Sequence, residues 1–217
     1  MKPMRMMASI LSRDEFCGGT MHTNRSIENP PIPLSEIAAS SWAKRLLIAL
    51  AGSWVIAASA WIEVPMVPVP MTMQTLAILL IGIACGARLA SETVGLYLVQ
   101  GAVGLPVFAG GAAGVQHLWG PTGGYLVGFL FAAALIGLLA DRGWSKGIIK
   151  PLCALAIGHI AVFIPGTLWL AGFTGFEGAI AAGLTPFIPG TIVKTLLAFA
   201  LFKGLVTWIY PKVATPI

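Results

Sequence analysis

The stretch that decides the fold class is 121–140, PTGGYLVGFLFAAALIGLLA, which contains no charged residue. About 20 predominantly apolar residues are needed to cross the hydrocarbon core of a bilayer as an α-helix. The apolar residues here are continuous and do not alternate with a period of two, which favours a helix over a strand of a membrane barrel. Pro121 suits the first turn of such a helix. We therefore predict that this stretch is a transmembrane helix.

The composition of the whole chain agrees with this reading. Its 217 residues are 57% hydrophobic and 10% charged, with a mean hydropathy of +0.88. Soluble domains carry about 25% charged residues, so this composition is typical of a membrane protein. Within a bilayer the backbone must satisfy its own hydrogen bonds, which leaves helices or a closed barrel. The prediction is an all-α integral membrane protein.

Five further apolar segments flank the first one. They lie at about 46–62, 75–85, 91–103, 148–170 and 189–210. The segments at 75–85 and 91–103, separated by a turn at 86–88, are short for a full crossing. A glycine- and alanine-rich loop with Glu177 is expected between the last two segments. The chain is thus predicted to form a polar, flexible tail at 1–41, broken by prolines, and a bundle of six transmembrane helices at 42–217.

The positions of the charges support six crossings. With the amino terminus inside, 12 of the 13 Lys and Arg residues fall on one side, and Lys194 is the exception. The opposite side holds Glu63 and Glu177. Glu92 is expected to be solvated or paired with Arg88, four residues earlier. An excess of basic residues marks the cytoplasmic side, so both termini are predicted to be cytoplasmic.

Lys194 is the strongest candidate for a functional residue. It lies about one turn into the last segment, where a charge costs about 2.5–3.5 kcal/mol on insertion scales. The alternative is a lysine whose stem extends to the membrane surface. Its place on the side that positive charge avoids argues against that alternative. The hypothesis is a cation that meets an anionic group of a ligand.

Other segments contain histidine or repeated small residues. His159, near the middle of the fifth segment, is either a neutral histidine bonded to a neighbouring helix or a ligand contact. Glycines recur every fourth residue at Gly120, Gly124 and Gly128, a pattern that predicts close helix packing. Small residues at Ala49, Ser53 and Ala57 form a face that should meet another helix, within this chain or in a partner.

Several classes of function are disfavoured. No Walker A pattern occurs, so the chain is not expected to hydrolyse ATP. The segments contain no nucleophile with a base and no metal-ligand pair, so neither an enzyme nor a metal cofactor is predicted. The basic residues form no stripe that would bind nucleic acid. The three cysteines, Cys17, Cys85 and Cys153, are scattered and imply no disulfide framework.

Five motifs carry a resemblance to a known family. They are PVPMTMQTLA (68–77), GLPVFAGGAAG (104–114), GPTGGYLVGF (120–129), GTLWLA (166–171) and PFIPGTIVK (186–194). Over about residues 46–205 the chain resembles the BioY family, the biotin-specific S components of energy-coupling factor (ECF) transporters. The resemblance implies six helices, cytoplasmic termini and an outward-opening vitamin site covered by loops. It also implies high-affinity biotin uptake at the bacterial cytoplasmic membrane, with no cofactor besides the transported biotin.

The resemblance also implies roles for individual residues. The biotin carboxylate would pair with Lys194, a charge-assisted bond. Hydrogen bonds to the ureido ring would come from polar groups, for which the candidates are Gln74, Thr122, Tyr125, His159 and Thr191. Trp119 and Phe108 would pack the apolar tail, and the loops 64–70 and 107–120 would close over the site.

The chain departs from the family at two positions. The last motif usually reads Pro-Gly-Asp-x-x-Lys, and here Thr191 takes the acidic position. Threonine forms hydrogen bonds but cannot balance the charge of an unliganded lysine. His159 stands where relatives often have asparagine.

The resemblance implies partners as well. They are lipid, a transmembrane coupling protein that would meet Ala49, Ser53 and Ala57, and two ATPase subunits. Two alternatives stay open: a self-sufficient carrier for biotin or another small anionic vitamin, and a membrane assembly subunit without a ligand.

Overall fold

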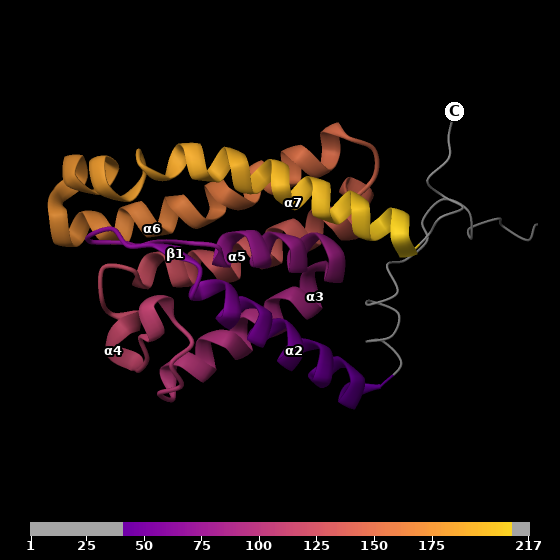
Figure 1. Ribbon diagram of the computed structural model, residues 1–217, viewed down its shortest axis with the longest axis horizontal. Helices are drawn as coiled ribbons and strands as arrows, with labels where there is room; N and C mark the ends of the chain where they lie inside the picture. The colour runs from indigo at the N-terminus through magenta and orange to yellow at the C-terminus, as the bar shows by residue number, and fades with distance from the viewer. Residues whose placement is uncertain (1–40, 210–217) are drawn as a thin grey trace, which may run out of the picture. The chain divides into compact units, whose positions relative to one another are not determined.

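The computed structural model describes residues 41–209 of the chain. The tail predicted at 1–41 therefore lies outside the described residues, apart from Ser41. The elements are α2 (Trp42–Ala60), β1 (Glu63–Val64), β2 (Met71–Thr72), α3 (Gln74–Ala102), η1 (Ala109–Gly111), α4 (Val115–Leu118), α5 (Gly123–Leu139), η2 (Ala140–Trp144), α6 (Ile149–Gly183) and α7 (Phe187–Ile209). The long helices pack side by side, with α5 between α3 and α6 (Figure 1).

The helices agree with a membrane bundle. Within residues 41–209, five helices are long and apolar enough to cross a membrane: α2, α3, α5 together with η2, then α6, and finally α7. The six predicted segments map onto these five because α3 contains both the second and the third. Gly86, inside α3, has φ +76° and ψ 171°, and the helix changes direction there (Figure 1). Glycine adopts positive φ without steric cost. The all-α fold class is confirmed, and the turn expected at 86–88 is a one-residue break.

The prediction of a loop after residue 170 is wrong. Helix α6 continues to Gly183 and is interrupted at Gly175, where φ is +74°. Glu177 therefore lies in a helical segment. Glycine and alanine suggested a loop from composition, but a helix with a single glycine break accommodates them, because only that one residue needs positive φ.

Glycines let α5 and α6 approach closely. A Cβ added at Gly124 would lie 2.5 Å from the Pro165 carbonyl oxygen, and one at Gly128 would lie 2.7 Å from the Val162 carbonyl oxygen. Any larger residue would separate the two backbones. The packing predicted from the glycine repeat is confirmed at these two positions. Gly120 precedes α5, and its carbonyl oxygen accepts a hydrogen bond from Trp169 Nε1 at 2.9 Å.

The small face of α2 lies inside this chain. Ala49, Ser53 and Ala57 are each at most 4% exposed. Helix α2 packs on α3, and a Cβ at Gly52 would lie 2.7 Å from Cγ2 of Thr93 on α3. Because α3 already covers these residues, the expectation that they form a partner interface is wrong. The helix that meets this face is α3 of the same chain, which was the other alternative.

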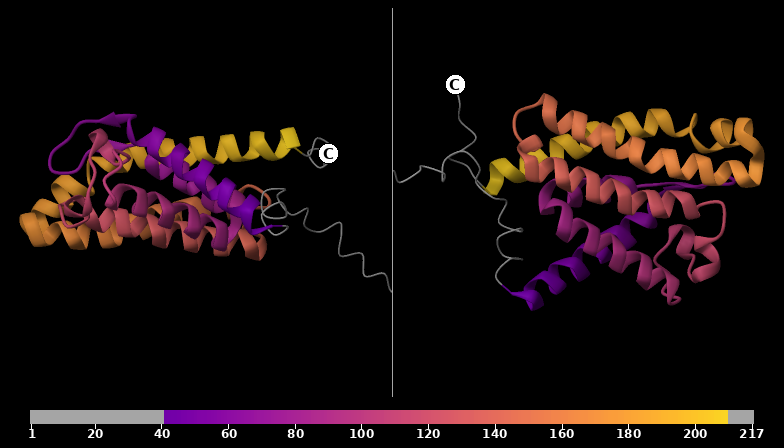
Figure 2. Two further views of the ribbon diagram at one scale, coloured as in Figure 1. Left: turned by 90° about the horizontal axis from the view of Figure 1, so that it is seen from below. Right: turned by 180° about the vertical axis from the view of Figure 1, so that it is seen from behind.

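Charged side chains gather at one end of the bundle. The start of α2, the break in α3, η2 and the end of α7 lie at this end (Figures 1 and 2). Glu92 pairs with Arg45 at 2.8 Å and with Arg88 at 3.4 Å, so the expected Arg88 pair is present and a second is added. Asp141 Oδ2 accepts a hydrogen bond from the backbone N–H of Ala87 at 3.0 Å. This carboxylate caps the second half of α3, whose first N–H groups have no partner within the helix.

Candidate functional site

A pocket lies toward the other end of the bundle. About 580 Å³ of space free of protein atoms lies in and above it, part of which is open solvent. The hairpin formed by β1 and β2, the start of α3, the loop before α4, and helices α4 to α7 all contribute to it. The lining residues are Val69, Pro70, Thr72, Gln74, Thr75, Phe108, Ala109, His117, Thr122, Tyr125, Leu126, Phe129, Val162, Phe163, Phe187, Thr191 and Lys194.

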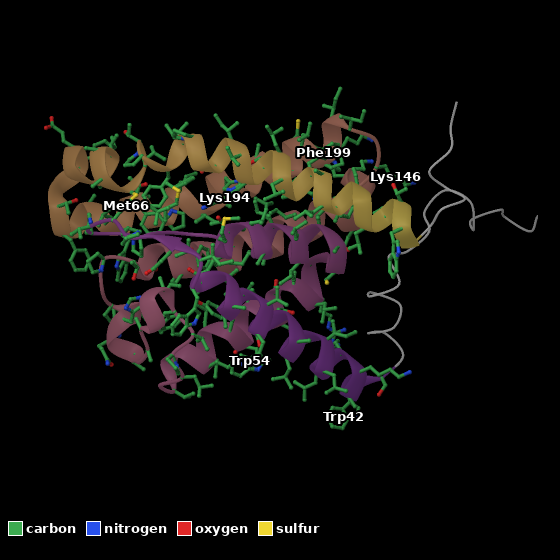
Figure 3. All side chains as sticks on the ribbon, in the orientation of Figure 1. Trp42, Trp54, Met66, Lys146, Lys194 and Phe199 are labelled. Atoms are coloured by element: carbon green, nitrogen blue, oxygen red, sulfur yellow. The ribbon has the colours of Figure 1, made fainter. Side chains whose placement is uncertain are left out.

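Lys194 is the charged residue of this lining. Its side chain leaves the inner face of α7 toward the hairpin (Figure 3), and it is 8% exposed. Its ammonium donates to the Thr72 carbonyl oxygen at 2.6 Å. An ammonium has three donors, and among residues 41–209 the structure gives this one a single, neutral partner. The remaining donors are available to a ligand.

Aromatic side chains form one wall of the pocket. The ring of Tyr125 stacks on Phe187 with centroids 6.4 Å apart, and Phe163 meets both rings edge-on. Side-chain atoms at Gly166 would overlap the Tyr125 ring, so that glycine makes room for it. The Tyr125 hydroxyl donates to the Gly183 carbonyl oxygen at 2.8 Å. The wall is therefore largely apolar, with the hydroxyl oxygen of Tyr125 as its polar atom.

Polar groups face this wall from the start of α3. The Thr72 hydroxyl donates to Gln74 Oε1 at 2.8 Å, and Gln74 Nε2 donates to the hydroxyl of Tyr97. Thr75 Oγ1 is buried and has no hydrogen-bond partner within the described residues. Unpaired buried hydroxyls are uncommon, since their desolvation is unfavourable. This atom is a further place for a polar ligand group.

The loop that contains α4 closes one side of the pocket. His117 stacks on Phe108 with centroids 5.2 Å apart, and its Nε2 lies 3.2 Å from the hydroxyl oxygen of Thr122. Phe108 is fully buried, under Gly101, whose missing side chain leaves space for the ring. Burial lowers the pKa of the His117 imidazole below its ordinary value. The loop is thus anchored by an aromatic ring and presents a neutral imidazole.

Six of the predicted site residues meet in the pocket. They are Gln74, Phe108, Thr122, Tyr125, Thr191 and Lys194. The hairpin and the loop before α4 cover it, through Val69, Pro70, Phe108 and Ala109. These residues come from four separate sequence motifs, so their meeting is a property of the fold.

Two of the predicted site residues do not line the pocket. His159 is 2% exposed and stacks behind Phe163, and its Nδ1 lies 3.2 Å from the Leu155 carbonyl oxygen and 3.1 Å from Thr195 Oγ1. Trp119 is 67% exposed and lies beside Trp169. The rotation of α6 turns His159 toward α7, and the α4 loop leaves Trp119 at the surface.

Sequence reasoning missed part of the lining. Val162 and Phe163 lie outside the quoted motifs, and no local pattern separates them from ordinary apolar residues. Phe129 and Phe187 lie within two quoted motifs but were not named as candidates. Thr72 and Thr75 flank Gln74 within a quoted motif, so that motif did signal their positions. Tyr97 was also missed, because a single tyrosine in an apolar helix has no distinctive spacing.

This geometry defines a class of protein: an all-α, multi-pass membrane protein with a small-molecule pocket built around one buried cation. Residues 28–210 match the BioY family. Because this match covers more than half of the chain, the chain belongs to the BioY family.

Relatives with known names agree with this assignment. The "Biotin transporter BioY2" of Lactococcus lactis is 39% identical over 156 residues, which cover 70% of this chain and 83% of the relative. The "Probable biotin transporter BioY" of Pyrococcus horikoshii is 37% identical over 146 residues, covering 67% and 86%. These relatives are transporters and not enzymes, as expected for this chain.

A solved structure has the same fold. It is described as the S-component for biotin from an ECF-type ABC transporter, and its TM-score to this chain is 0.67 at 27% sequence identity. The match covers 75% of this chain and 90% of the solved one. The arrangement of helices described above is therefore that of an ECF S-component.

Proposed function

We propose that this chain binds biotin in the pocket and carries it across the membrane as the substrate-specific component of an ECF transporter. The proposal rests on membership of the BioY family and on a pocket of suitable chemistry. Biotin has an apolar ring and tail, a polar ureido group and a carboxylate. A site for it needs an apolar wall, several hydrogen-bonding groups and a cation.

The observation that carries the proposal is the environment of Lys194. A buried ammonium needs a compensating negative charge or several acceptors, because desolvation of an isolated cation is costly. No carboxylate lines this pocket within residues 41–209, and Thr191 stands where the family usually has an aspartate. The carboxylate of biotin would supply the missing charge and form a charge-assisted hydrogen bond with Lys194.

The other lining residues would hold the rest of the ligand. Gln74, Thr122, Tyr125 and Thr191 offer hydrogen-bonding groups to the ureido ring, and Phe108 and Phe187 offer apolar surface. His159 and Trp119 would act indirectly, since neither lines the pocket. The hairpin and the α4 loop would have to open for biotin to enter.

The chain would work together with other subunits in the cytoplasmic membrane. It has no Walker A motif, so ATP-driven uptake would need two ATPase subunits and a transmembrane coupling protein. The two relatives named above come from an archaeon and a bacterium. We propose a bacterial inner membrane, with the charged end of the bundle and both termini in the cytoplasm.

Calorimetry with the purified protein tests the proposal. We expect biotin to bind tightly and its methyl ester, which lacks the carboxylate charge, to bind at least tenfold more weakly. Absence of biotin binding would contradict the proposed function. Equal binding of the acid and the ester would contradict the pairing with Lys194 but keep the substrate.

Uptake measurements separate the modes of transport. We expect proteoliposomes that contain this chain alone to show no biotin counterflow, and uptake to appear when the coupling protein and ATPases are added with ATP. Counterflow by the chain alone would favour a self-sufficient carrier instead.

A further inference from the structure

A chain of hydrogen bonds joins the two loops that cover the pocket. It begins at Lys194, whose ammonium donates to the carbonyl oxygen of Thr72 in the hairpin. The Thr72 hydroxyl donates to Gln74 Oε1, and Gln74 Nε2 donates to the Tyr97 hydroxyl. The Tyr97 hydroxyl in turn donates to the Val107 carbonyl oxygen at 3.1 Å, where the second loop begins. Residues far apart in the sequence thus form one connected network.

The directions of the three bonds between Thr72 and Val107 follow from the last of them, the bond to the Val107 carbonyl oxygen. A carbonyl oxygen only accepts, so the proton of the Tyr97 hydroxyl must point to Val107. The Tyr97 oxygen is then left as an acceptor toward Gln74, which requires the amide nitrogen, and not the amide oxygen, to face Tyr97. Gln74 Oε1 consequently faces Thr72 and accepts from its hydroxyl.

This network determines what Gln74 presents to the pocket. An amide nitrogen has two hydrogens and an amide oxygen has two lone pairs. One of each is used by Tyr97 and Thr72, which leaves one donor and one acceptor in fixed places on a residue that lines the pocket. Without Tyr97 the amide could rotate by half a turn and exchange donor for acceptor.

Tyr97 itself does not line the pocket. It is 0% exposed, and its ring packs edge-on against Phe108 with centroids 5.6 Å apart. A phenylalanine would provide the same packing. The hydroxyl is buried, and its two hydrogen bonds go to Gln74, which lines the pocket, and to Val107, next to the lining residue Phe108.

We propose that Tyr97 is a positioning residue for biotin binding. Its hydroxyl holds the Gln74 amide in one orientation and ties the loop at Val107 to the network that begins at Lys194. The inference rests on the proposed function, because biotin binding is its readout.

Tyr97→Phe tests the inference, since it removes the hydroxyl and keeps the ring. We expect biotin affinity to fall about five- to tenfold, because a buried hydroxyl that forms two hydrogen bonds is lost. We also expect faster biotin dissociation, because the loop at Val107 loses an anchor. The matched control is Thr93→Val, one turn earlier on α3, where a buried hydroxyl donates to the Leu89 carbonyl oxygen outside the network. This control should bind biotin within twofold of the unmodified protein.

A double-mutant cycle with Gln74→Leu shows whether Tyr97 acts through Gln74. If it does, adding Tyr97→Phe to Gln74→Leu should weaken binding by less than twofold further. Independent effects that multiply, or a Tyr97→Phe affinity equal to that of Thr93→Val, would overturn the inference. Absence of biotin binding by the unmodified protein would instead contradict the proposed function.

A second variant tests the inference if Tyr97→Phe does not fold. If Tyr97→Phe does not fold, Thr72→Val breaks the next bond of the network, and it too must lower biotin affinity several-fold. Unchanged affinity in that variant would overturn the inference.

Discussion

The two ends of this bundle place charged side chains in different surroundings. At one end Glu92 lies between Arg45 and Arg88, and the Asp141 carboxylate caps the second half of α3. Glu92, Arg45 and Arg88 thus have counter-ions from the same chain, and Asp141 has a backbone N–H. In the pocket the ammonium of Lys194 has one neutral carbonyl oxygen from the hairpin.

The difference separates structural charges from a charge that is available for binding. Charges that pair with a counter-ion or cap a helix within the chain contribute to the stability of the fold. A buried cation without a counter-ion keeps its attraction for an anion, and low polarity around it strengthens that attraction. The first kind of site should respond to mutation through stability, and the second through ligand affinity.

Removal of the pocket cation should give the largest effect on binding. We expect Lys194→Met to weaken biotin at least tenfold in calorimetry, because a charge-assisted bond is lost. The ester should then bind this variant as well as the acid does. Lys203→Met, on the same helix but outside the pocket lining, is the control and should keep its affinity. A tenfold loss of biotin affinity in that control would contradict a specific role of Lys194 in binding.

Removal of the cap at the α3 break should act on stability. We expect Asp141→Ala to lower the free energy of unfolding by about 1 kcal/mol, because the Ala87 N–H loses its acceptor. Denaturation in detergent would measure this, with biotin affinity kept within twofold. Asp141→Asn retains an acceptor and should lose less. Equal losses in both variants would show that charge matters more than the cap.

Removal of the Glu92 charge should have a smaller effect. The pair with Arg45 is partly exposed, with side-chain exposures of 31% and 35%, and such pairs contribute at most about 1 kcal/mol. We expect Glu92→Gln to lower the thermal midpoint slightly, and less so in high salt. A large loss of biotin affinity in this variant would contradict the separation between the two ends.

The smallest expected effect concerns pH. Burial places the pKa of His117 below its ordinary value of 6.5 in the folded protein. The unfolded chain therefore binds more protons at this imidazole as the pH falls below 6.5, and stability decreases with it. This contribution is complete above pH 6.5 and is lost as the pH falls through the lowered pKa. Thermal unfolding at pH 7.5 and 5.5 should show a smaller decrease for His117→Asn than for the unmodified protein. An equal decrease would mean that other groups cause it.

Local sequence patterns predicted most of the helices correctly. They failed where the backbone conformation of a single residue decides whether a helix breaks or continues. The uncharged stretch at 121–140 contains α5, because a continuous apolar segment in lipid satisfies its own backbone hydrogen bonds as a helix. The break at Gly86 and the continuation of α6 past residue 170 depend on the φ angle of one glycine each. Composition cannot show which of 26 glycines adopts such an angle.

The candidate site, too, was predicted only in part. Lys194 was found because a charge in an apolar segment is exceptional wherever the segment packs. His159 drew attention for a similar reason, yet the rotation of α6 places it behind Phe163. Whether a polar residue faces a pocket or its own helix depends on rotations that small local preferences do not determine.

The sequence by itself determined the membrane class, the approximate helices, the family motifs and the one exceptional lysine, because hydropathy and charge act over short stretches of chain. The tertiary structure alone decided which side chains surround that lysine, that α2 buries its small face on α3, and that Tyr97 joins Gln74 to the loop at Val107. Those contacts connect residues that are distant in the chain, and they exist only once the helices have packed.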